Sequence, residues 1–136
     1  SARPMYFEYG GPGGWSGGDV GVGQSPSPWA LFPEGYALSS ASHPYITIAN
    51  PNSTSVAVNV LFLFPSGYPV LHTVTVPANG RSTIRVLDLF DNREFSTFVI
   101  SQDPTKSVVV ERPQYCPYRG WTDGFVSAGY TGNPPA

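Results

Sequence analysis

The sequence contains little charge. Charged residues make up 12% of the 136 positions, the formal net charge is −2, and Lys106 is the only lysine. An average soluble domain has roughly 25% charged residues. The sequence therefore offers no basic stripe to attract nucleic acid and no polybasic patch for an anionic membrane surface. A surface with so little charge is also poorly protected against association, which suits a protein that meets copies of itself.

Cysteine and long apolar runs are also scarce. Cys116 is the only cysteine, so an intrachain disulfide is excluded. Its thiol is either buried within the domain or bridged to another molecule. The longest apolar run extends from Val60 to Phe64, far below the ~20 residues needed to cross a bilayer, so we expect no membrane span.

Glycine and proline are abundant, with 15 of each, and are unevenly placed. Residues 1–28 combine an extended segment with a Gly-rich stretch from Gly10 to Gly23 and a Ser-Pro tail, a composition typical of a flexible linker. Residues 29–136 hold the β-rich body and end in a second Gly/Pro-rich tail. We therefore expect an N-terminal extended strand with a linker over 1–28, followed by a β-sandwich repeat over 29–136.

The body alternates apolar and polar residues with a period of two. From Val56 to Phe64 every second residue is Val or Phe, and the intervening positions become apolar in the second half, which indicates a central strand. Val70–Val76 alternates again, and the Asn79-Gly80 pair forms a turn that tolerates positive φ. Further strands follow at turn spacings of about 8–12 residues. The pattern predicts an all-β fold, an antiparallel two-sheet immunoglobulin-like sandwich, with a closed barrel as the alternative.

One segment of the sequence occurs twice. Arg3-Pro4-Met5-Tyr6-Phe7-Glu8-Tyr9 recurs as Arg112-Pro113-Gln114-Tyr115-Cys116-Pro117-Tyr118, with four identities in seven positions. A Gly-Trp pair follows each copy, at Gly14-Trp15 and at Gly120-Trp121. The chain therefore holds one full repeat preceded by the tail of another.

Several short motifs follow one another in a fixed order. They are Phe32-Pro33-Glu34-Gly35, Tyr45 to Asn52, Val76 to Arg81, Val108 to Tyr115 and Gly120-Trp121. This series resembles a module found in tandem on large secreted and cell-surface proteins of Gram-positive and related bacteria. The resemblance implies an immunoglobulin-like β-sandwich that serves cell-surface architecture and carries no catalytic activity.

Residues that could carry chemistry are few. His43 and His72 have no neighbouring ligands at the spacing of a metal site, so we expect neither metal binding nor catalysis from them. Asp88, Asp91 and Glu94 are spaced three apart, and a Ca²⁺ site is the alternative to the solvated loop that we favour. We expect no enzyme activity, cofactor or metal.

Aromatic residues make up 14% of the chain and gather in the two tails. Tyr, Trp and Arg are common anchors of protein interfaces, whereas flat rings also stack on sugars. Because the tails are duplicated and join one repeat to the next, we favour an interface. Its expected residues are Arg3, Pro4, Met5, Tyr6, Phe7, Tyr9, Trp15, Tyr115, Tyr118 and Trp121. Asn52 opens an Asn-Ser-Thr pattern and is a candidate glycosylation site.

The extended segment before Gly10 carries the most specific expectation. Since Gly-rich residues follow it, we expect it to add to a sheet edge of a neighbouring copy, with pairing inside its own domain as the alternative. The predicted function is a non-catalytic structural module or subunit of an extracellular surface protein or filament. Its partners are copies of itself or adjacent repeats. The alternative is a carbohydrate-binding accessory module of a secreted enzyme, with glycans as partners.

Overall fold

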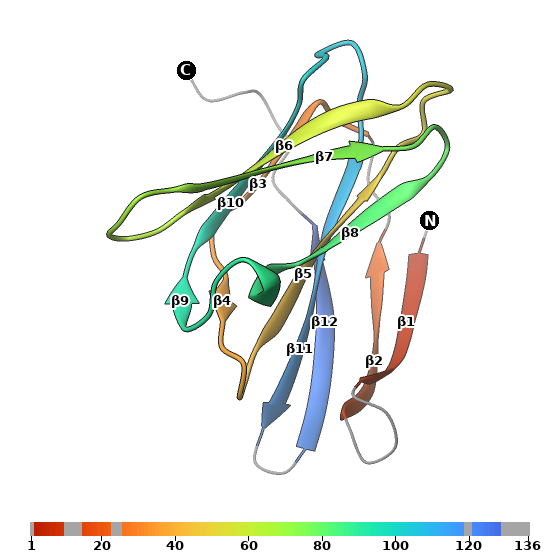
Figure 1. The fold of residues 1–136 in the computed structure, drawn as a ribbon. Helices are drawn as coiled ribbons and strands as arrows, with labels where there is room; N and C mark the ends of the chain where they lie inside the picture. Colours follow the sequence, from red (N-terminus) through yellow and green to blue (C-terminus); the bar gives the residue numbers. More distant parts are fainter. Residues whose placement is uncertain (1, 10–14, 23–25, 119–120, 129–136) are drawn as a thin grey trace.

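Two antiparallel four-stranded sheets packed face to face form the body of the protein (Figure 1). The computed structural model describes the backbone of residues 2–9, 15–22, 26–118 and 121–128, and the side chains of residues 26–115. The first sheet has the order β3-β10-β6-β7, formed by Trp29–Phe32, Ser96–Ser101, Val56–Leu63 and Val70–Val76. The second has the order β12-β11-β5-β8, formed by Trp121–Ala128, Val109–Tyr118, His43–Ala49 and Arg81–Arg85. The predicted all-β sandwich is confirmed, and its immunoglobulin-like character stays a prediction.

Smaller elements complete the described chain. They are β1 (Ala2–Tyr9) paired with β2 (Trp15–Val22), β4 (Tyr36–Ala37) paired with β9 (Arg93–Glu94), and the 3₁₀ turn η1 (Val86–Asp88). Within the described residues, no helix has both the length and the apolar character needed to cross a membrane.

The core lies between the two sheets and follows the alternation of β6. Val56, Val58, Val60 and Phe62 are buried, and Phe64, just beyond the strand, packs half-buried against them. Strand β6 lies between β10 and β7, so the central position predicted from its apolar second face is confirmed. Burial of each such side chain contributes about 1.5–3 kcal/mol, which makes this row a principal source of stability.

A buried asparagine ties several strand ends together. Asn50, only 2% exposed, follows β5 directly. Its Nδ2 donates to the carbonyl oxygens of Thr54, Val76 and Pro77 at 2.9, 3.1 and 3.1 Å. Its Oδ1 accepts hydrogen bonds from the backbone N and the Nδ2 of Asn52 at 2.9 and 2.7 Å. This side chain therefore links the end of β5 to the start of β6 and the end of β7.

The duplicated sequence folds twice as the same hairpin. Strand β1 pairs with β2, and β11 pairs with β12, both antiparallel. In each hairpin a Tyr–Trp pair stands next to the connection, Tyr9 opposite Trp15 and Tyr118 opposite Trp121. Each paired position of the first hairpin corresponds to a paired position of the second, because the three-residue difference in spacing falls in the connecting residues.

The structure of the N-terminal hairpin differs from two expectations, the flexible linker and the lone extended strand. Residues 15–22 form strand β2 and are not a flexible linker, because backbone groups pair whatever side chains they carry. Residues 10–14 and 23–25 of the expected linker lie outside the described residues. Since β1 pairs with β2 over its whole length, it is not a lone strand, and any contact with a neighbouring copy involves the hairpin as a unit. Strand β2 lies beside β12, which places the two hairpins next to each other (Figure 1).

Candidate functional site

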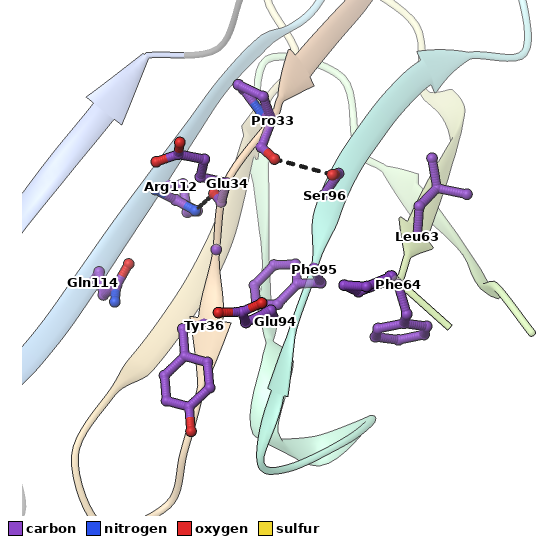
Figure 2. A pocket seen from close by; sticks show the side chains of 12 residues that line it. Pro33, Glu34, Tyr36, Leu63, Phe64, Glu94, Phe95, Ser96, Arg112 and Gln114 are labelled. Atoms are coloured by element: carbon purple, nitrogen blue, oxygen red, sulfur yellow. Dashed lines mark hydrogen bonds between the residues drawn. The ribbon is translucent and has the colours of Figure 1, made fainter. Parts of the chain in front are cut away.

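An open pocket of about 660 Å³ lies where the end of β6 and the β9–β10 segment approach β11 (Figure 2). The lining residues are Pro33, Glu34, Gly35, Tyr36, Leu63, Phe64, Pro65, Glu94, Phe95, Ser96, Arg112 and Gln114. A pocket of this volume falls within the range of small-molecule sites, about 300–1,000 Å³. The pocket therefore has a volume that a small ligand could occupy.

Two sequence motifs from opposite ends of the repeat meet in one wall of this pocket. Arg112, on β11, is 8% exposed, and its Nη1 donates a hydrogen bond to the carbonyl oxygen of Glu34. Its guanidinium lies 5.9 Å from the centre of the Phe32 ring. A Cβ on Gly35 would lie 2.7 Å from Phe95 Cζ and 2.8 Å from Arg112 Nη1, so a larger residue would force one of these side chains to shift. The Phe-x-Glu-Gly and Arg-Pro motifs thus have a shared structural role.

The polar groups of the pocket wall form a connected network. Gln114 Nε2 donates to Ser42 Oγ, and Ser42 Oγ donates to the carbonyl oxygen of Tyr36 at 2.7 Å. On the other side, Ser96 Oγ donates to the carbonyl oxygen of Pro33 at 3.0 Å (Figure 2). These bonds hold the segment before β4 between β10 and β11.

The rim of the pocket is aromatic and acidic. Tyr36 is 37% exposed and its hydroxyl donates to Asn92 Oδ1 at 3.1 Å. Glu34 and Glu94 are both exposed. A ring and two carboxylates at an open mouth suit a neutral polar ligand that offers hydroxyl donors better than they suit an anion.

An aromatic cluster adjoins the pocket. The rings of Phe62, Phe64, Phe90 and Phe95 meet edge to face, with centroids 4.9 to 5.8 Å apart. The guanidinium of Arg93 lies 3.5 Å from the centre of the Phe64 ring, a distance typical of a cation–π contact. This packing fixes the position of Phe95 and Phe64 in the pocket wall.

The two histidines do not form a common site. His43 is buried on β5, and its Nε2 lies 2.7 Å from the carbonyl oxygen of Ser39. His72 lies half-buried on β7, in the other sheet. The structure therefore gives each histidine its own surroundings and does not bring the two into one catalytic arrangement.

The three acidic residues also have separate surroundings. Asp88 pairs with Arg85 at 2.8 Å, and Glu94 stands at the pocket rim. Asp91 accepts hydrogen bonds from the backbone N–H groups of Ser39 and Asn92 at 2.9 and 2.7 Å. The bond from Ser39, above all, holds the pKa of Asp91 below its ordinary value. In the described part of the chain, no three His, Cys, Asp or Glu side chains are grouped so that they could hold a metal ion.

The expected interface residues all belong to the two adjacent hairpins. Tyr115 is half-buried, and its ring meets that of Tyr45 edge to face at 5.5 Å. The side chains of the others lie outside the described residues, although their backbone is placed: Arg3, Pro4, Met5, Tyr6, Phe7, Tyr9, Trp15, Tyr118 and Trp121. The fold therefore brings both copies of the duplicated segment to one side of the molecule (Figure 1).

The candidate glycosylation site at Asn52 is half-buried and hydrogen-bonded. Its Nδ2 donates to Asn50 Oδ1 at 2.7 Å and to the carbonyl oxygen of Ser107 at 2.8 Å. A glycan on this nitrogen would replace one of its two hydrogens, so modification would cost one of these bonds.

The pocket could not be predicted from the sequence. Glu34, Gly35 and Arg112 are recognisable as motif residues, but Arg112 follows Glu34 by 78 positions, and this separation hides their contact. A usable signal is the charged Arg112 at a position that alternation from Val108 and Val110 predicts to be buried.

Comparisons with known proteins find structures with a similar fold but do not identify a family. No protein-family model and no curated protein matches the sequence. The crystal structure of Thermotoga maritima 1070 is similar over 82% of this chain and 100% of its own, with a TM-score of 0.70 and 20% identity. The Anabaena sensory rhodopsin transducer is similar over 65% of this chain and 87% of its own, with a TM-score of 0.56 and 20% identity. At this identity the similarities show the fold alone.

Proposed function

We propose that the chain is a non-catalytic structural module of an extracellular surface protein or filament, which associates with copies of itself through its two hairpins. The extracellular and bacterial parts of this proposal rest on the resemblance of the motif series to tandem surface modules. The self-association rests on the duplicated hairpin, which is the observation that carries the proposal.

The two hairpins have the same register but different roles. Strand β11 completes the sandwich by pairing with β5, whereas β1 and β2 form a sheet of their own in the described residues. A two-stranded hairpin alone is marginally stable in water, so the N-terminal hairpin needs a surface to pack on. The N-terminal hairpin packs beside β12 of its own chain, and each further copy of the chain presents the same surface.

Exchange of identical elements between copies requires little new interaction energy, because the contacts are the same in both arrangements. The charge-poor composition supports this proposal, since little repulsion opposes the approach of two copies. Tyr6, Phe7, Tyr9, Trp15, Tyr115, Tyr118 and Trp121 lie on the strands of these hairpins and are the kind of residue that anchors interfaces.

Removal of residues 1–22 tests the proposal. Among the described side chains, the buried apolar residues all lie between Trp29 and Val110, so the shortened chain should keep its cooperative unfolding transition. Its mass in solution, measured by sedimentation equilibrium, should fall to that of a smaller species. An assembly of the same stoichiometry after this removal would show that the hairpin does not join the copies.

A second candidate function is the binding of a carbohydrate, favoured by the open pocket with Tyr36, Glu34 and Glu94 at its mouth. An aromatic ring beside carboxylates that accept hydroxyl hydrogen bonds is suited to a neutral sugar.

A glycan titration tests this candidate with a matched pair of variants. Tyr36→Ala should weaken binding at least tenfold, whereas Tyr68→Ala should not change it, because Tyr68 is 92% exposed and lies outside the pocket lining. Absence of binding to a broad glycan array, or equal effects of the two variants, would exclude the pocket as a sugar site.

A further inference from the structure

The four outer strands of the two sheets differ in how well they are protected from pairing with another chain. The outer strands are β3 and β7 in the first sheet and β12 and β8 in the second. Strand β3 has four residues and stands between Pro28 and Pro33, and β8 carries Arg81 and Arg85 at its ends. Strand β12 lies beside β2. Short length, proline, charge and cover are the usual means by which proteins block an edge.

Strand β7 has none of these protections. Its seven residues, Val70–Val76, include no Asp, Glu, Lys or Arg, no proline and no glycine. It pairs with β6 on one side, and within the described residues no strand pairs with its other side. The outer row of backbone N–H and C=O groups on β7 is therefore a template for a further strand.

The sequence around β7 fits a second copy of β7 itself. Pro69 and Pro77 flank the strand at equal distances from Thr73, since 73 − 69 = 77 − 73 = 4. Two antiparallel copies centred on Thr73 would pair along all seven residues and leave the prolines of both copies outside the ladder. Any shift of register shortens the ladder or brings in a proline, which has no N–H to donate.

The side chains agree with the same register. On the outer face Leu71 would stand opposite Thr75, and Thr73 opposite its own counterpart. On the inner face Val70 would stand opposite Val76, and His72 opposite Val74. Apart from His72, these residues have no titratable side chain, and most are β-branched, which stabilises antiparallel pairing. Leu71, now 61% exposed, would gain a neighbour.

We propose that β7 is a self-pairing edge, by which two copies join antiparallel about a twofold axis at Thr73. The first sheet of each copy has four strands, and pairing through β7 joins the first sheets of the two copies into one continuous sheet. This contact is isologous, involves no residue of the N-terminal hairpin, and belongs to the first sheet. The β11–β12 hairpin is part of the second sheet, and the N-terminal hairpin lies beside β12. Two different contacts on one chain let copies join in series.

Cysteine crosslinking in the full chain tests the register, in a background where Cys116→Ser leaves a single thiol. Thr73→Cys places two thiols opposite each other at the axis, and oxidation should yield covalent dimers on a non-reducing gel. Thr75→Cys is the matched control, because its two thiols would lie four residues apart along the strands, roughly 13 Å, beyond disulfide reach. Equal crosslinking of both variants, or of neither, would overturn the proposal.

A charge at the axis provides the second measurement. Thr73→Lys places two ammonium groups against each other and should lower the average mass of the full chain in sedimentation equilibrium. Thr83→Lys, at an exposed position of β8, is the control and should leave the mass unchanged. An unchanged mass with Thr73→Lys would contradict the self-pairing of β7. Crosslinking at Thr73 reports β7 alone, so its outcome is independent of whether the hairpins associate.

Discussion

Thr97 is the polar residue that fits its surroundings least well. It lies on β10 opposite Phe62 of β6 and is fully buried. Its Oγ1 has no hydrogen-bond partner among the described residues. A buried hydroxyl without a partner loses its bonds to water and gains none in return, so it opposes folding.

Thr97→Val should therefore stabilise the protein. Valine keeps the β-branched shape and removes the unpaired hydroxyl, and we expect the free energy of unfolding to rise by about 1 kcal/mol. Urea denaturation checks this, with Thr83→Val at an exposed position as the control that should change little. A loss of stability in Thr97→Val would mean that the hydroxyl is satisfied in solution.

Strand ends, and not only strand interiors, determine how the two sheets of this sandwich are joined. The chain crosses from β5 to β6 and from β7 to β8 at the same end, where Asn50 Nδ2 reaches three carbonyl oxygens. The backbone N of Asn50 also donates to the carbonyl oxygen of Gly80 at 2.8 Å. Two connections between the sheets therefore depend on one side chain.

Asn50→Ala should be one of the most damaging substitutions outside the apolar core. It removes the Asn50 donor from the buried carbonyl group of Val76 and from the part-buried carbonyl groups of Thr54 and Pro77. We expect a loss of at least about 2 kcal/mol in the free energy of unfolding. Asn59→Ala is the control: Asn59 bonds Thr73 and Gln102 at the surface, so its replacement should cost less than about 0.5 kcal/mol. Equal losses in thermal or urea unfolding would refute this role for Asn50.

For the whole molecule, the features encoded by neighbouring residues could be predicted and those formed by distant residues could not. The bounds of β7 agree with the sequence prediction, and Asn79 has the positive φ, 54°, expected of its turn. Both follow from local alternation and turn chemistry. Strand β2 escaped prediction because its Gly-rich sequence carries no strand pattern and its pairing with β1 decides its conformation. The Arg112–Glu34 contact escaped because it joins the two ends of the repeat.

Self-association is the central claim, and the mass of the full chain in solution tests it most directly. The chain has a mass of 14.6 kDa. Sedimentation equilibrium over a wide range of protein concentrations should give an average mass well above this value, rising with concentration. A single species of 14.6 kDa at every concentration would contradict the account.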